Sequence, residues 1–261
     1  VDQIDDTFAD PEEIREALDT RLVGVLPESH QERQLHVQPD APEDVTRTAF
    51  ANALRMLAST VRIEMSQQGL VSLAVTSAGR SEGKTLVAAN LAATLANAGE
   101  RVLLIDADLH RPRAHTLFDA EREPGLSNLL VGDMEPEQVM QKTEVGNLLV
   151  ITAGALPPSP VDLLASTHGQ ETIERLSDLA DYVIWDTPPA GFLADATVIS
   201  HATDRTLFVV GKNARRAAVR ETVHNLREIG ARLIGVCANQ VRPTGASSYY
   251  YYYQDYYTDE E

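Results

Sequence analysis

The sequence predicts an α/β protein whose mostly parallel, doubly wound sheet carries helices on both faces. Two observations support this fold class: segments that are apolar throughout recur along the chain, and segments with helical periodicity separate them. The apolar segments span residues 70–75, 102–105, 148–151, 182–185, 206–210 and 233–237. Sheets built from such strands are buried on both faces and bind ligands at the carboxyl ends of their strands.

The composition of the chain limits the number of domains and the classes of partner. With 261 residues, 43% of them hydrophobic, the chain can form one large domain with tails. Its net charge of −17 argues against nucleic acid as a partner and against direct docking on an anionic membrane surface. The single cysteine, Cys237, excludes an internal disulfide and is typical of a reducing cytoplasm.

Residues 1–41 are expected to form an acidic segment and linker ahead of the main domain. Within them, residues 11–18 favour a short helix that begins with proline and has Asp10 as its N-cap. Residues 23–27 are a short apolar piece, and the polar residues that follow are typical of a flexible linker.

The main domain is expected at residues 42–241, and it begins with a long helix over residues 42–68. Apolar residues repeat along that helix at steps of three and four, so they form one face. They are Phe50, Leu54, Leu57, Val61 and Met65. We expect this face to cover the core; an added contact with another subunit is the alternative.

The most informative motif is the stretch 78–85, which reads Ala-Gly-Arg-Ser-Glu-Gly-Lys-Thr. An apolar strand precedes it and an alanine-rich helix over residues 86–98 follows, which is the context of a phosphate-binding P-loop. We expect Lys84 to reach the β- and γ-phosphates and Thr85 to bind Mg²⁺. A polar loop that contains Gly-Lys-Thr by chance is the alternative, and this context argues against it. The residues expected to contact nucleotide are Gly79, Arg80, Ser81, Glu82, Gly83, Lys84, Thr85 and Leu86.

Two further strands end in aspartate, and we expect these ends at the same edge of the sheet as the P-loop. Asp106 and Asp108 follow one strand, and Asp186 ends another. A single aspartate at a strand end is more often a cap or turn residue, but three beside a P-loop indicate phosphate and metal chemistry. The expected Mg²⁺ ligands are Thr85, Asp106 and Asp186, and the expected catalytic residues are Lys84, Asp106, Asp108 and Asp186.

Asp108 is our candidate, ahead of Asp106, for orienting or deprotonating an acceptor hydroxyl. Arg111 and Arg113 follow directly in the sequence. They either contact a phosphate or a neighbouring subunit, or they form ion pairs with local acids. Asp195 is expected to cap a helix near the site.

The C-terminal segment, residues 242–261, is expected to be a flexible tail. Seven of the eight tyrosines of the chain lie in it, namely Tyr249, Tyr250, Tyr251, Tyr252, Tyr253, Tyr256 and Tyr257. Such a segment is a poor core element and a good substrate for modification. A sticky low-complexity tail is the alternative.

Together these motifs resemble the bacterial tyrosine kinases (BY-kinases) of capsule and exopolysaccharide assembly, over residues 45–257. The segments that carry the resemblance are 77–85 (Walker A), 103–109 with Arg111 and Pro112 (Walker A′), 183–189 (Walker B), 125–130, 154–164, 235–239 and the tail. Walker A by itself fits any P-loop ATPase. The paired aspartates are typical of the MinD/ParA-like branch, and the tyrosine cluster separates the kinases from the rest of that branch.

The resemblance implies a P-loop NTPase fold of the MinD/ParA-like type and a protein-tyrosine kinase that uses ATP and Mg²⁺ and yields ADP. It implies that the γ-phosphoryl group passes in trans to tyrosines of the tail. This reaction would control oligomerisation and the synthesis and export of exopolysaccharide or capsule. It also implies that Asn239 reads adenine.

The resemblance implies three kinds of partner and no nucleic acid. The partners are further copies of the chain through the tail and the kinase domain, a transmembrane activator segment or chain, and a cognate tyrosine phosphatase. Residues 1–27 are similar to the segment after the second transmembrane helix of fused members, but no stretch is apolar enough to span a bilayer and no signal peptide is recognisable. We therefore expect a cytoplasmic domain, tethered to the inner face of the bacterial plasma membrane by a segment absent from this chain.

The chain departs from the family pattern at positions that bear on activity. Residues 80–81 read Arg-Ser in place of Pro-Gly, Leu86 replaces a hydroxyl residue, and His110 replaces an arginine. The helix motif Glu-x-x-Arg-x-x-Arg has Thr48 and Ala51 at its first two positions. These changes put nucleotide affinity and the usual oligomer contact in question.

Two alternatives to a tyrosine autokinase therefore stay open. One is a MinD/ParA-like ATPase switch that binds partners without phosphorylating tyrosine. The other, weaker alternative is an inactive regulatory module that binds only ADP, and the departures in Walker A and Walker A′ motivate it. Proteins of the MinD/ParA branch usually carry a second lysine near residues 78–79, and its absence here favours the kinase.

Overall fold

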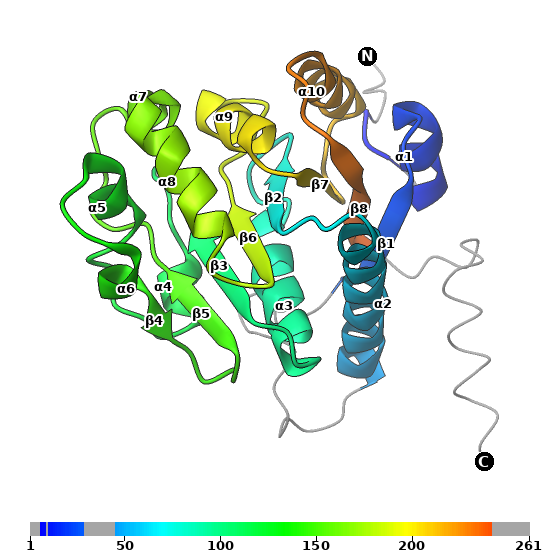
Figure 1. Ribbon diagram of the computed structural model, residues 1–261. Helices are drawn as coiled ribbons and strands as arrows, with labels where there is room; N and C mark the ends of the chain where they lie inside the picture. Colours follow the sequence, from blue (N-terminus) through cyan, green and yellow to red (C-terminus); the bar gives the residue numbers. More distant parts are fainter. Residues whose placement is uncertain (1–5, 9, 29–44, 242–261) are drawn as a thin grey trace.

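An eight-stranded, mostly parallel β-sheet forms the centre of the protein (Figure 1). The computed structural model describes residues 6–8, 10–28 and 45–241; most of the expected linker and the tyrosine tail lie outside these residues. The strands lie in the order β1-β8-β7-β2-β6-β3-β5-β4. Neighbouring strands of this sheet are parallel except β4 and β5.

The six apolar segments of the sequence all form strands, which confirms the predicted fold class. The strands are β1 (Leu22–Pro27), β2 (Ser72–Ser77), β3 (Val102–Asp106), β4 (Gln141–Lys142), β5 (Leu148–Ile151), β6 (Tyr182–Asp186), β7 (Arg205–Gly211) and β8 (Leu233–Val241). The short edge strand β4 has no strand pattern in the sequence, because both of its residues are polar.

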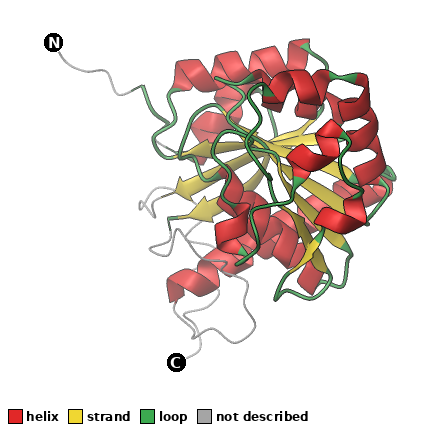
Figure 2. Ribbon diagram, turned by 90° about the vertical axis from the view of Figure 1, so that its left-hand side faces the viewer, coloured by secondary structure: helices red, strands yellow, loops and turns green. Residues whose placement is uncertain are grey.

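Helices cover both faces of the twisted sheet (Figure 2). They are α1 (Pro11–Leu18), α2 (Val45–Gln67), α3 (Lys84–Asn97), α4 (Ala114–Leu117), α5 (Leu126–Val131), α6 (Pro136–Val139), α7 (Pro160–Ala165), α8 (Thr167–Ser177), α9 (Ala194–Ala202) and α10 (Arg216–Glu228). Side chains of successive strand residues point to opposite faces of the sheet. Leu104 packs in the cluster of α2 and α3, whereas Leu103 packs in the cluster of α5, α8 and α9. Among the described residues, no helix has both the length and the apolarity to cross a membrane.

Helix α2 presents the predicted apolar face to the core. Leu54, Leu57, Val61 and Met65 are fully buried, and Phe50 is nearly so. They pack in one cluster with α3 and the strands beneath. Burying such a side chain contributes roughly 1.5–3 kcal/mol, so this face is a major source of stability.

The N-terminal segment adds a helix and a strand to the main domain. Asp10 caps α1 as predicted, because its carboxylate accepts a hydrogen bond from the Glu13 amide at 2.9 Å. Helix α1 packs beside α10 in a third apolar cluster, and β1 pairs in parallel with β8 at the edge of the sheet. Residues 1–41 are expected from the sequence to lie ahead of the main domain, but β1 within them is a full strand of its sheet and pairs with β8 near the end of the domain.

Candidate functional site

Three adjacent strands bring the P-loop and the predicted carboxylates to one edge of the sheet. Strands β2, β6 and β3 are neighbours, and Asp106 is paired in register with Asp186. The P-loop follows β2 at the same carboxyl edge. The strand order therefore brings the P-loop, Asp106 and Asp186 together, as the sequence predicts.

The P-loop turns sharply between β2 and α3. Ser81 has a φ of 61° and Gly83 a φ of 87°, both in the left-handed region that disfavours side chains. Gly83 precedes Lys84, the first residue of α3, so the amino terminus of that helix opens directly onto the loop. This is the arrangement that favours an anion at a helix N-terminus.

Glu82 lies inside the loop rather than on its surface. Its carboxylate accepts hydrogen bonds from the Gly79 amide at 2.5 Å and the Gly211 amide at 3.3 Å. Burial raises the pKa of Glu82 to about 7, although both hydrogen bonds and the charge of Lys84 oppose that rise. The side chain thus braces the loop against the end of β7.

Asn239 supports the same loop from β8. It is buried, and its amide nitrogen donates to the Glu82 carbonyl oxygen at 3.0 Å. A Cβ atom on Gly83 would lie 2.1 Å from that nitrogen, so only glycine fits there. That Asn239 reads adenine stays a prediction, and its contact with the loop is a role that the sequence did not reveal.

Lys84 forms an ion pair with Asp108. The Lys84 Nζ and Asp108 Oδ2 atoms are 3.2 Å apart, and both side chains are largely buried. The other oxygen of Asp108 accepts the Arg111 amide at 2.9 Å and the His110 amide at 3.3 Å. A phosphate group at the P-loop would compete with Asp108 for the lysine ammonium.

Asp106 organises the loop that follows β3. Its Oδ2 atom accepts the amides of Arg113 and Ala114, each at 2.9 Å, and its Oδ1 atom accepts the Asp108 amide at 3.3 Å. Burial, together with the charge of Asp186, raises the pKa of Asp106. These hydrogen bonds hold the carboxylate in a fixed orientation beside Asp186.

Asp186 has free coordination capacity on both of its carboxylate oxygens. Both of its oxygens are buried, and neither has a hydrogen-bond donor at bonding distance in the described part of the chain. Burial raises the pKa of Asp186, whereas the Lys84 charge and the nearby Thr85 hydroxyl lower it. Buried, unpaired carboxylate oxygens beside a threonine hydroxyl suit a small, hard cation such as Mg²⁺.

A metal ion at this position would need ligands from outside the protein. Among the described residues, no group of three or more histidine, cysteine, aspartate or glutamate side chains is arranged to hold a metal. A cation on Asp186 and Thr85 would therefore take its remaining ligands from phosphate oxygens and water, as Mg²⁺ usually does at nucleotide sites.

His110 and Asp195 form a pair that the sequence did not reveal. The His110 Nε2 and Asp195 Oδ2 atoms are 2.8 Å apart, and the Asp195 side chain is only 3% exposed. Asp195 lies in the first turn of α9, where Leu193 is the N-cap, so the expected capping role is wrong. The pair ties the Asp108 loop to α9, and only the tertiary fold brings these two residues together.

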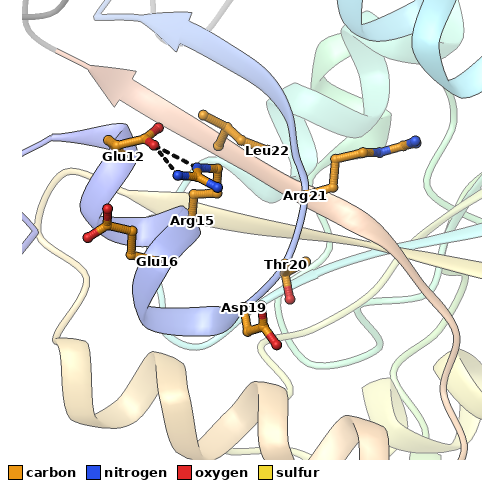
Figure 3. Close-up of a pocket in the computed structure, with 7 residues that line it drawn as sticks. All are labelled: Glu12, Arg15, Glu16, Asp19, Thr20, Arg21 and Leu22. Carbon is orange, nitrogen blue, oxygen red and sulfur yellow. Dashed lines mark hydrogen bonds and ion pairs between the residues drawn. The ribbon is translucent and has the colours of Figure 1, made fainter.

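A hollow of about 640 Å³ lies away from this edge, between α1 and the start of β1 (Figure 3). Its lining consists of Glu12, Arg15, Glu16, Asp19, Thr20, Arg21 and Leu22. Arg15 and Glu12 pair with each other along α1, with Arg15 Nε 2.7 Å from Glu12 Oε1. None of the predicted site residues lines it, so the P-loop edge is the candidate functional site.

Comparisons with known sequences point to one group of enzymes. A family model described as an AAA domain matches residues 72–227. The tyrosine-protein kinase YwqD of Bacillus subtilis (strain 168) is 34% identical over 197 residues, which are 75% of this chain and 83% of YwqD. The tyrosine-protein kinase Etk of Escherichia coli (strain K12) is 36% identical over 212 residues, which are 80% of this chain and 28% of Etk.

Solved structures agree with the sequence comparisons. The kinase domain of Escherichia coli Etk superimposes with a TM-score of 0.81 at 29% identity, covering 93% of this chain and 98% of that domain. The septum site-determining protein MinD of Pyrococcus horikoshii OT3, solved with Mg-ADP, gives a TM-score of 0.56 at 22% identity. That match covers 64% of this chain and 68% of MinD, and it shows a shared fold.

Proposed function

Because this chain belongs to the bacterial tyrosine kinases, we propose that it phosphorylates the tyrosines of its own C-terminal segment, in trans between copies. The observation that carries the proposal is the meeting of Lys84, Asp108 and Asp186 at one P-loop, in a chain that gathers most of its tyrosines at one end. The proposed acceptors are Tyr249, Tyr250, Tyr251, Tyr252, Tyr253, Tyr256 and Tyr257.

The proposed phosphoryl donor is ATP, bound by the P-loop over residues 79–86. The loop amides and the amino terminus of α3 would hold its phosphates, and Asn239 would face the adenine side. Thr85 and Asp186 would hold Mg²⁺ directly, and Asp106, whose oxygens already accept backbone amides, would hold it through water; the ion supplies neutralisation of phosphate charge. The orphaned oxygens of Asp186 support this assignment.

Asp108 is proposed to orient the acceptor hydroxyl. Its Oδ2 atom is engaged by Lys84 at 3.2 Å, whereas its Oδ1 atom is held by two backbone amides. When Lys84 turns to the γ-phosphate, Oδ2 becomes available to accept a hydrogen bond from a phenol. A free tyrosine has a pKa of about 10, so such an acceptor assists transfer at neutral pH.

The wider role is proposed from the same family membership. Copies of the chain would associate through the tail and the kinase domain, and phosphorylation would control that assembly and, through it, polysaccharide synthesis and export. A transmembrane segment or activator chain would hold the domain at the inner face of the membrane, and a tyrosine phosphatase would reset it.

The direct test is intact-mass analysis after incubation with Mg-ATP. We expect several phosphate additions on the native chain and on the Lys142→Met control, whose lysine lies on the edge strand β4. Lys84→Met should abolish them, because Lys84 is the cation placed to stabilise the transferring phosphoryl group.

A mixing experiment tests whether the phosphoryl group passes from one copy of the chain to another. A Lys84→Met chain mixed with an active chain whose seven tail tyrosines are phenylalanine should gain phosphate. ATP turnover without any phosphate on tyrosine would instead identify a nucleotide switch, and a chain that binds ADP but does not turn over ATP would contradict the kinase proposal.

A further inference from the structure

Arg111 and Arg113 are distinguished by their position, because they follow the catalytic carboxylates directly in a strongly acidic molecule. The protein carries a net charge of −17, and several exposed or half-buried arginines of the described chain are paired with a carboxylate. The pairs are Arg15–Glu12, Arg21–Glu64, Arg62–Glu100, Arg101–Asp181, Arg175–Glu135 and Arg216–Glu13. Arg111 and Arg113 are exposed and take part in no ion pair within the described residues.

The backbone of these two arginines is fixed at the catalytic carboxylates. The Arg111 amide donates to Asp108 Oδ1 at 2.9 Å, and the Arg113 amide donates to Asp106 Oδ2 at 2.9 Å. The backbone of each arginine is therefore hydrogen-bonded directly to a carboxylate of the site. Both residues are exposed, and neither side chain takes part in an ion pair within the described residues.

The tyrosine tail has the complementary charge. Residues 249–261 contain Asp255, Asp259, Glu260 and Glu261 and no lysine or arginine. Guanidinium groups bind carboxylates through paired, charge-assisted hydrogen bonds. An acceptor tyrosine in the site would bring its acidic neighbours up to these arginines.

We propose that Arg111 and Arg113 select the acceptor by binding acidic residues that flank its tyrosine, with the tail of a second copy as the occupant. The proposal rests on the tail kinase activity proposed above. Exposed ion pairs contribute roughly 0.2–1 kcal/mol each. Two such arginines facing several carboxylates should therefore change the KM for an acidic peptide about tenfold.

The charge of the two arginines also limits how many phosphates the tail can carry while it stays bound. Two arginines offset about one phosphate, because each phosphate adds roughly −1.5 to −2 charges. Further phosphates face a chain of strongly negative net charge, so repulsion exceeds attraction after the first additions. Selection of an acidic acceptor and release of a heavily phosphorylated one are thus compatible.

The test uses the full chain with its seven tail tyrosines replaced by phenylalanine, and a synthetic peptide of residues 249–261 as substrate. A second peptide carries asparagine and glutamine in place of the four acids. We expect the neutral peptide to have a KM about tenfold higher with little change in kcat, and we expect high salt to remove the difference.

Variants of the enzyme test the arginines themselves. Arg111→Glu/Arg113→Glu should raise the KM for the acidic peptide and regain activity on a peptide with lysines in place of the acids, whereas Arg111→Lys/Arg113→Lys should retain most of the selectivity. Arg232→Glu is the matched control, because Arg232 is exposed and unpaired in the described chain but precedes β8 at the opposite edge of the sheet.

Each unexpected outcome has a distinct meaning. If neither peptide is phosphorylated, the proposed tail kinase activity fails and this inference falls with it. If both peptides are used with equal kcat/KM, the kinase proposal stands and the selection by arginine is refuted. An equal loss of ADP affinity in the double glutamate variant would place the arginines at the nucleotide and also refute it.

Discussion

Glu82 shows how a single residue can link the P-loop to the pH of the medium. It is 6% exposed, and its two oxygens accept amides from Gly79 within the loop and from Gly211 at the end of β7. Burial raises its pKa from the ordinary value of 4.5 to about 7. Between these values the folded chain holds a proton that the unfolded chain has released, so folding becomes less favourable as the pH rises.

We predict that Glu82→Gln removes this pH dependence. The contribution of the protonated Glu82 to stability is complete below about pH 4.5 and lost as the pH rises through about 7. As the pH rises across this range, the native chain should therefore lose stability relative to the variant. The difference between their free energies of unfolding should change by at most on the order of 3 kcal/mol. Urea unfolding of both proteins between pH 5 and 8 measures the difference.

The comparison isolates Glu82, because Asp106 and Asp186 also have raised pKa values but are present in both proteins. Parallel stability curves for the two proteins would show that Glu82 is ionised in the folded chain throughout. That result would contradict its buried, loop-bracing role as the cause of the pH dependence.

At the scale of elements, α2 joins the N-terminal strand to the rest of the fold. Leu57 is fully buried, and its Cδ1 atom would lie 3.1 Å from a Cβ atom built on Gly24 of β1. The same helix packs against α3 through its apolar face. The glycine of β1 therefore allows the close approach of α2 that covers this end of the sheet.

We predict that Leu57→Ala lowers the free energy of unfolding by about 2–5 kcal/mol, because it leaves a cavity between α2 and β1. The matched control is Ile63→Ala on the same helix, where the side chain is 56% exposed and the expected loss is below about 1 kcal/mol. Denaturant unfolding of the two variants measures both values. Equal losses would mean that α2 is not anchored through this face.

At the scale of the whole molecule, charge connects the proposed reaction to assembly. The chain has a net charge of −17 before any modification. Each phosphate adds roughly −1.5 to −2 charges beside the four acids of the tail. Repulsion between copies should then outweigh the contacts that a tail makes in a neighbour's site.

We predict that full autophosphorylation lowers the mass of the assembly, measured by light scattering before and after incubation with Mg-ATP. The full chain with seven phenylalanines in the tail should keep its mass under the same treatment, since it has no acceptors there. An assembly that is unchanged after complete phosphorylation, or a native chain that is monomeric from the start, would overturn the prediction.

The sequence by itself determined the fold class, the P-loop and the aspartates at the strand ends. These features depend on local patterns: continuous apolar runs give strands, and contiguous residues give the P-loop. The parallel order then places Asp106 and Asp186 at the edge where the loop lies. The family followed from the same motifs, and the comparisons with YwqD and Etk confirm it.

Only the tertiary structure decided which groups engage one another within that site. It placed β1 beside β8, Asn239 beneath Gly83, and His110 against Asp195. It also showed that Asp106 is held by three backbone amides, whereas the oxygens of Asp186 are left without a donor. The physical reason for the first three is distance along the chain, because they join segments far apart in the sequence that only packing brings together. The Asp106 contacts are local, but they depend on the path of the loop after β3, which no sequence pattern specifies.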